Sequence, residues 1–369
     1  PRGFAAEWLN NWNFIPSPHA TIKLILHEAF HVYQDKTAPD KHADEADIAR
    51  YPLLDPVNNA LYALEGDILR DALLLRDSRA RLEKIKEFIA VRTARQARLD
   101  KRLVAYENLV EYSEGLAKYV EYKYYKTGES VKPVAEMYYL AGFNGYKGIL
   151  EEKFKSSVER MVKIVSVSDD SFGNKFGTGP ARYRLYDLGA CQALLLDEIS
   201  PGWKGKIFGD GVYLTDLLKA SLALPGGELR RYLEQAKTEY NYDKAYAEKL
   251  EFKRAGEEQI KKKLTEILGT DRTLITISYK GLADKIGIEH TAFGLTPISE
   301  NSAIYELVPV KVYFNESADL KFKQAVPVII DKEKKEIAFA VSAPPSAFEP
   351  GFRDKLETDD FNLLSAKMR

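Results

Sequence analysis

Two histidines four residues apart, with a glutamate directly after the first, stand near the start of the chain. The stretch LILHEAFHVYQ contains His27, Glu28 and His31 in the pattern H-E-x-x-H. On a helix, residues four apart are neighbours on one face, so both imidazoles can bind one Zn²⁺ ion from the same side. Glu28 is rotated away from that side and can take a proton from a zinc-bound water, whose pKa the metal lowers to about 7. The pattern therefore predicts a zinc site with Glu28 as the general base.

The segment around this pattern is predicted to be a helix. Ser17 and Pro18 supply an N-cap followed by a proline at the first helical position. Apolar residues such as Ile22, Leu26 and Phe30 give the segment a broad apolar surface. The same kinds of signal predict further helices at about 55–101, 102–126, 133–164, 180–198, 212–223 and 226–267.

The pattern changes from helical to strand-like near Gly269. Segments rich in β-branched and aromatic residues follow, and DKEKK separates two of them as in a hairpin; these segments are 272–280, 303–314, 321–330 and 336–342. The stretch SAPPSAFEPG resembles a linker. We therefore expect a mainly α fold, α+β overall, with a mostly helical domain at 1–268, a small β-rich domain at 269–345 and a tail at 346–369.

A catalytic zinc ion needs a third protein ligand, and the best candidate is a carboxylate in EYSEGLAKYVEY, residues 111–122. From Glu114 this stretch resembles the helix that carries the third ligand in gluzincin metallopeptidases. It is closest to the aminopeptidase N family, whose pattern there is E-G-F-A-x-Y-x-E. The resemblance implies a zincin-like catalytic domain in which Glu114 is the third zinc ligand.

A third motif follows in the order that this family has. LYDLGACQALL, residues 185–195, resembles the family's Y-E-K-G-A stretch at the start of a helix. There a tyrosine donates a hydrogen bond to the oxyanion of the tetrahedral intermediate, and the resemblance gives this role to Tyr186. A neutral phenol directed at developing negative charge is a sensible electrostatic stabiliser beside zinc.

The chain departs from the family in two respects. Glu114 follows His31 by 83 residues, against about twenty in the family, and a helical insertion at about 45–105 would account for the difference. No G-x-M-E-N segment precedes the motif helix, so specificity for a free amino terminus is not implied. Glu65, in ALEGDIL, is a rival third ligand that lacks the A-x-Y-x-E continuation. Glu111 is expected to support the ligands from behind, and Glu121 to be structural or to face the substrate.

A run of basic residues raises the question of a nucleic-acid or membrane surface. One side of a predicted helix carries Arg92, Arg95, Arg98, Lys101 and Arg102. The chain has 54 basic and 55 acidic residues, so no overall charge favours an anionic partner. We therefore interpret the run as the solvated face of a long helix.

Composition limits the remaining classes. The one cysteine excludes an intramolecular disulfide and a zinc site built from cysteines. No apolar run reaches the length of a transmembrane segment. Because the sequence begins at Pro1, we expect a processed chain and favour a secreted or periplasmic protein over a cytoplasmic one. The oligomeric state is not in the sequence.

Together these features predict a zinc metallopeptidase that acts on a peptide or protein substrate. His27, His31 and Glu114 are the expected zinc ligands, Glu28 is the base and Tyr186 stabilises the oxyanion. The alternative is a non-catalytic helical binding protein with a degenerate or structural zinc site.

Overall fold

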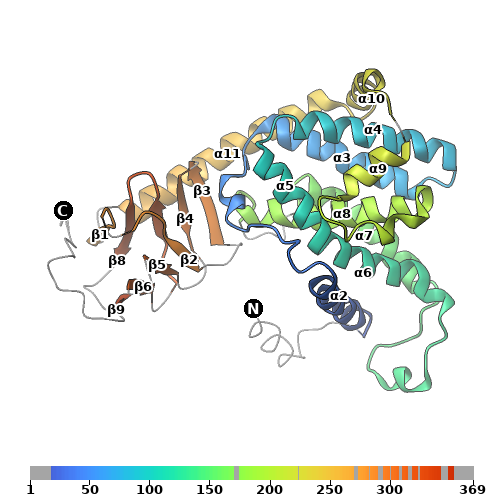
Figure 1. The fold of residues 1–369 in the computed structure, drawn as a ribbon, viewed down its shortest axis with the longest axis horizontal. Coiled ribbons are helices and arrows are strands. Elements are labelled where there is room, and N and C mark those ends of the chain that lie inside the picture. Colours follow the sequence, from blue (N-terminus) through green and yellow to red (C-terminus); the bar gives the residue numbers. More distant parts are fainter. Residues whose placement is uncertain are drawn as a thin grey trace. The chain divides into compact units, whose positions relative to one another are not determined.

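The computed structural model of the chain describes residues 18–169, 174–222, 224–269, 273–281, 283–289, 294–299, 301–306, 310–314, 318–322, 325–341 and 348–352. They form a mainly helical region followed by a small antiparallel β region, which confirms the predicted fold class (Figure 1). The chain divides into two compact units. The helical unit holds the described residues up to Asp44 with Tyr62–Ser168 and Tyr183–Tyr240. The β-containing unit holds Glu45–Leu61, the described part of Asp169–Arg182 and the described residues from Asn241.

The helices lie within most of the expected ranges, but several of these ranges contain two helices instead of one. They are α2 (Pro18–Thr37), α3 (Pro56–Leu74), α4 (Ser78–Gln96), α5 (Lys101–Val110), α6 (Leu116–Thr127), α7 (Ile149–Val165), α8 (Thr178–Ile199), α9 (Leu214–Leu222), α10 (Gly226–Glu239) and α11 (Tyr242–Leu268). The helix expected at 226–267 is broken by Asn241, which has φ +49° and whose side chain accepts from the Lys244 N–H. Asn is one of the few residues that adopts this left-handed conformation readily, and it also caps the next helix.

Two other expectations about helices need correction. The segment expected as a helix at 133–164 becomes α-helical only at Ile149, and a short 3₁₀ helix at Ala135–Tyr139 precedes it. Glycines with positive φ at 142, 145 and 148 separate the two and stop a continuous helix. The helix expected at 102–126 contains a single π-helical stretch at Glu111–Gly115 between α5 and α6, here called the π-turn.

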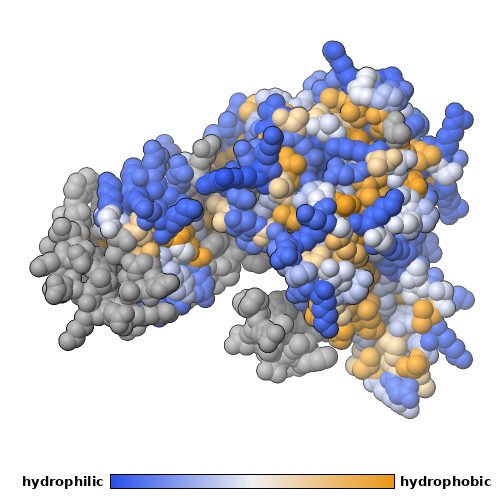
Figure 2. Space-filling view, viewed as in Figure 1, coloured by the Kyte–Doolittle hydropathy of each residue, from blue (hydrophilic) through white to orange (hydrophobic). Residues whose placement is uncertain are grey.

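Within the helical unit, α2 packs along α6, and α4 packs against α9 and α10. α3 and α4, which lie in the segment predicted as an insertion, supply fully buried core residues such as Ile68 and Phe88. Large hydrophobic side chains are exposed on the segment before α7, most of all Tyr139 at 86%, with Val131, Val134, Tyr138 and Leu140. Hydrophobic surface is visible on this projecting segment in Figure 2. No helix among the described residues has the length and apolar composition needed to cross a membrane.

The described residues of the β-containing unit form two antiparallel sheets. One has the order β1-β8-β7-β4-β3, from β1 (Thr273–Ser278), β8 (Glu336–Val341), β7 (Val328–Asp331), β4 (Ser302–Tyr305) and β3 (Leu295–Ser299). The other has the order β2-β5-β6-β9, from β2 (Gly287–Glu289), β5 (Lys311–Tyr313), β6 (Ala318–Phe322) and β9 (Phe348–Phe352). The predicted hairpin is confirmed as β7–β8, with Asp331 opposite Glu336. β9 pairs with β6, so part of the expected linker and tail is a strand.

Candidate metal centre

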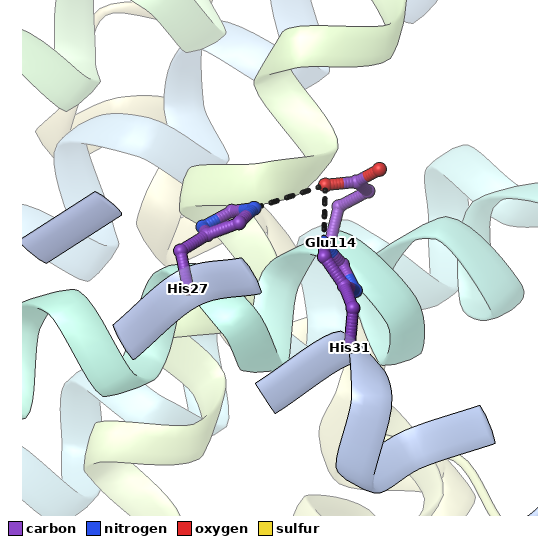
Figure 3. Close-up of side chains that lie close together, drawn as sticks. All are labelled: His27, His31 and Glu114. Atoms are coloured by element: carbon purple, nitrogen blue, oxygen red, sulfur yellow. Dashed lines mark ion pairs between the residues drawn. The ribbon is translucent and has the colours of Figure 1, made fainter. Parts of the chain in front are cut away.

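Three of the predicted residues lie together at the contact between α2 and the π-turn. His27 and His31 point from successive turns of α2 toward Glu114 (Figure 3). Each Nε2 atom lies 3.4 Å from the same carboxylate oxygen, Oε2 of Glu114. One ligand atom from each of the three residues lies within 4.8 Å of the others. His31 and Glu114, which are 83 residues apart in the sequence, are therefore neighbours in the fold.

Two of the three donor separations are compatible with a zinc ion. Donor atoms at the corners of a tetrahedron, about 2.0–2.2 Å from zinc, lie about 3.3–3.6 Å from one another. The two separations of 3.4 Å between Nε2 and Oε2 agree with such an edge. Two imidazoles and one carboxylate form a ligand set of catalytic zinc sites, in which water takes the fourth position. The side chain of His31 is 27% exposed and that of Glu114 17%, so the cluster is open to solvent on one side.

The helix that carries Glu114 is locally distorted at the ligand. Glu114 lies in the π-turn, a five-residue π-helical stretch that joins α5 to α6. Single-turn π segments inside α-helices occur frequently at functional sites. A Cβ atom on Gly115 would lie 2.7 Å from Cα of Gly189, and one on Gly189 would lie 2.6 Å from the Glu111 carbonyl oxygen. Glycine at both positions therefore lets α8 touch the backbone of the π-turn directly.

Side chains behind both histidines fix their orientation. Nδ1 of His27 lies 2.8 Å from Oε1 of Glu121, and Nδ1 of His31 lies 3.0 Å from Oε1 of Gln34. Gln34 donates through Nε2 to the Tyr112 carbonyl at 2.7 Å, which turns its oxygen toward His31. The atoms that face the two Nδ1 atoms, a carboxylate oxygen and an amide oxygen, are both acceptors, so they favour a proton on each Nδ1 and leave each Nε2 for a metal ion.

The electrostatics of the cluster favour a cation. Burial opposes the charged form of His27, but hydrogen bonds to Glu114 and Glu121 outweigh it and raise the pKa of His27 to about 9. Burial also opposes ionisation of Glu121, yet His27, Lys118 and Lys23 outweigh it and lower the pKa of this carboxyl to about 2. The Glu121 carboxylate is thus held ionised beside His27, and positive charge on His27 is stabilised.

Of the two residues predicted to act on substrate, Glu28 lies on α2, which carries both histidines, and Tyr186 lies on α8, which packs against the π-turn. Glu28 is exposed on α2, directly after His27. Tyr186 is half-buried on α8, three residues before Gly189, and its ring lies 5.1 Å from that of Tyr183. The contact of Gly189 with the π-turn places this part of α8 beside the turn that carries Glu114. The catalytic roles of Glu28 and Tyr186 stay predictions.

Glu65, the other candidate for the third ligand, forms ion pairs with two arginines instead. Glu65 is fully buried on α3, and its two oxygens accept from Nε of Arg92 at 2.9 Å and Nε of Arg95 at 2.7 Å. Among the described residues it is not part of the metal-ligating cluster. Glu111 also contacts an arginine, since Nη1 of Arg92 donates to its Oε1 at 2.7 Å, and no contact with a histidine of the cluster is observed among the described side chains.

These contacts correct the interpretation of the basic run. Arg92 and Arg95 are 0% exposed, so this part of α4 is not a solvated face. They neutralise buried glutamates that come from other helices, and the sequence of α4 alone gives no sign of those partners. Arginine is almost never fully buried unless it is paired, which is why the run predicted a surface.

Sequence reasoning underestimated Glu121 and omitted Gln34. Glu121 is two turns after Glu114, and that spacing already predicts a common helix face. Gln34 is three residues after His31 on α2, a spacing that places neighbouring side chains on one face. Both signals were present, but their direction toward the histidines depends on how α2 packs against α6.

Comparisons with protein-family models, with curated proteins and with solved structures find no match to this chain.

Proposed function

We propose that the chain is a zinc-dependent peptidase of the gluzincin type, with His27, His31 and Glu114 as zinc ligands. The observation that carries the proposal is the pair of 3.4 Å separations from the two Nε2 atoms to one oxygen of Glu114. These separations match neighbouring corners of a zinc tetrahedron. Zinc in this position would polarise a substrate carbonyl and lower the pKa of a bound water.

The side chains around the cluster have distinct roles in this proposal. Glu121 and Gln34 orient the two imidazoles through Nδ1. Glu28 takes a proton from the attacking water and later delivers it to the leaving amine. The phenol of Tyr186 donates a hydrogen bond to the oxyanion of the tetrahedral intermediate. The exposed position of Glu28 on α2 and the contact of α8 with the π-turn support these two assignments.

The first experiment combines metal analysis with peptide cleavage. Protein purified without chelator is expected to hold one zinc ion per chain. It is also expected to cleave a mixture of synthetic peptides, with free and with blocked amino termini, as followed by mass spectrometry. Glu28→Gln should keep the zinc and lose about a hundredfold to ten-thousandfold in kcat, because proton transfer by a positioned base contributes this much.

Asp35→Asn is the matched control. Asp35 is a carboxylate on the same helix, and its side chain is 67% exposed. This variant should keep both zinc and activity. A Glu28→Gln protein that retains zinc and hydrolyses as fast as the parent would exclude the mechanism. Tight zinc binding without any cleavage by the parent would favour a binding protein with a structural metal site.

A further inference from the structure

Glu111 shares the π-turn with Glu114 but enters the core of the helical unit. Its side chain is 1% exposed. Oε1 accepts from Nη1 of Arg92 at 2.7 Å, and Oε2 accepts from Nε2 of Gln192 at 2.8 Å. Both carboxylate oxygens therefore have charged or polar donors, one from α4 and one from α8.

These three residues belong to a closed ring of hydrogen bonds. Thr215 on α9 donates from Oγ1 to Oε1 of Gln192 at 2.7 Å. Nη1 of Arg92 lies 3.5 Å from Oγ1 of Thr215, which completes the ring. The four residues come from α4, the π-turn, α8 and α9, and each is at most 2% exposed. A buried network of this kind, in which both oxygens of Glu111 are hydrogen-bonded, holds its members in one arrangement. Nη2 of Arg92 makes no hydrogen bond to a described residue and lies 2.9 Å from Oε2 of Glu65 in an ion pair.

The ring of hydrogen bonds includes residues from two segments next to the metal cluster, the π-turn and α8. On one side, Glu111 is three residues before Glu114 in the π-turn. On the other, Gln192 is three residues after Gly189, whose Cα touches the π-turn. The bond from Gln192 to Glu111 therefore fastens α8, which carries Tyr186, to the segment that carries the ligand.

We infer that Glu111 is a positioning residue for the metal centre, one that sets the π-turn for Glu114 and holds α8 against it. The inference rests on the proposed zinc site. Glu111 contacts neither the metal position nor a substrate in this account. It acts through the backbone of the π-turn, and its loss should appear first in metal affinity and coordination geometry.

The chain offers a matched control in Glu107. Glu107 is also fully buried, lies one turn earlier on α5 and is paired with an arginine of α4, since both of its oxygens accept from Arg95 at 2.7 and 2.9 Å. It lies outside the π-turn. Glu111→Gln and Glu107→Gln thus remove comparable buried carboxyl groups, and only the first removes one beside the ligand.

The experiment measures zinc affinity by competition with a chromophoric chelator and records the absorption spectrum of the Co²⁺-substituted protein. Glu111→Gln is expected to weaken zinc binding about tenfold and to change the cobalt spectrum. This is the lower end of the loss seen when a group hydrogen-bonded to a ligand is removed, because Glu111 acts through the backbone. Glu107→Gln should bind zinc within about twofold of the parent and keep its spectrum. Thermal melting of both variants without metal shows whether each is still folded, so that weaker zinc binding can be attributed to the geometry of the site and not to unfolding.

Equal zinc affinity in the parent and Glu111→Gln, or an equal loss in both variants, would overturn the inference and leave the proposed zinc site intact. A parent that binds no zinc would overturn both. If Glu111→Gln does not fold, Gln192→Met takes its place, because it removes one donor to Glu111 and keeps the Arg92 pair. It should weaken zinc binding up to about tenfold, and unchanged affinity would again count against the inference.

Discussion

Two groups of glutamates in the helical unit have opposite surroundings. Glu65, Glu107 and Glu111 face Arg92 and Arg95, and all five side chains are at most 1% exposed. Glu114 and Glu121 instead face the imidazoles of His27 and His31, and the side chain of His31 is 27% exposed. The first group is here called the arginine network and the second the imidazole cluster.

The difference concerns where the compensating positive charge comes from. Guanidinium keeps its charge at any accessible pH, so the positive charge of the arginine network is built into the chain. The five side chains of this network are also closed to solvent. In the imidazole cluster the positive charge is exchangeable. Without metal it is a proton on His27, whose pKa is raised to about 9, and a metal ion bound at Nε2 takes the place of that proton. Two features therefore distinguish a structural ion pair from a candidate metal site: whether arginine or histidine faces the carboxylate, and whether solvent reaches the side chains.

The largest expected effect comes from breaking the arginine network. Arg95→Met leaves Glu65 and Glu107 buried without this cation and should lower the free energy of unfolding by about 3–5 kcal/mol. His31→Ala should lower the free energy of unfolding by only about 1 kcal/mol, because one hydrogen bond of a partly exposed side chain is lost. Urea denaturation in the presence of chelator measures both. Similar losses in the two variants would mean that the imidazole cluster is as structural as the network.

The second effect is the stabilisation of the folded protein by a bound metal ion, which we expect at the imidazole cluster and not at the arginine network. Zinc at a hundred times its Kd should raise the free energy of unfolding of the parent by about 2.7 kcal/mol. Glu114→Gln should abolish most of this gain, because the cluster loses its anionic ligand. Mg²⁺ is the matched control ion and should have little effect, since it prefers oxygen ligands in octahedral geometry. Scanning calorimetry measures the gain, and an undiminished zinc effect in Glu114→Gln would place the metal elsewhere.

The sequence predicted the imidazole cluster better than the arginine network for a physical reason. The chemistry of His27 and His31 is local, because helical spacing alone brings them to one face. Glu114 was found by its resemblance to a family motif, and the structure brings it within 3.4 Å of both histidines. The network depends on pairs such as Arg92 with Glu65, which join different helices, and spacing within one helix carries no information about them.

The fold follows the same rule. The mainly helical region and the later strands were predicted, because periodicity and composition are local signals. The strands β2, β3 and β9 were missed, since short strands are defined by their partners: β9, for example, pairs Phe348 with Phe322. Gly115 and Gly189 stand inside helices, where glycine indicates close approach, but the sequence does not reveal that they approach each other.

The third effect tests the carboxylate behind His27. Glu121→Gln keeps the shape of the side chain and removes the charge that faces Nδ1 at 2.8 Å. Zinc affinity should fall tenfold to a hundredfold, toward the upper end because a charged acceptor is lost. Lys118→Met is the control: it removes a neighbour of Glu121 that bonds to its other oxygen, and it should have the smaller effect. If Lys118→Met weakens zinc binding as much as Glu121→Gln, the net charge of the region matters more than the bond to His27.

The smallest effect separates charge from orientation within the imidazole cluster. Gln34→Leu removes a neutral acceptor from Nδ1 of His31, and we expect zinc affinity to fall about tenfold, the lower end of the range. A neutral amide orients the ring but adds little to the basicity of Nε2, whereas the Glu121 carboxylate does both. Chelator competition on the two single variants gives the ratio directly. Equal losses would mean that orientation accounts for the whole effect, and that the charge of Glu121 serves Lys23 and Lys118 rather than the metal.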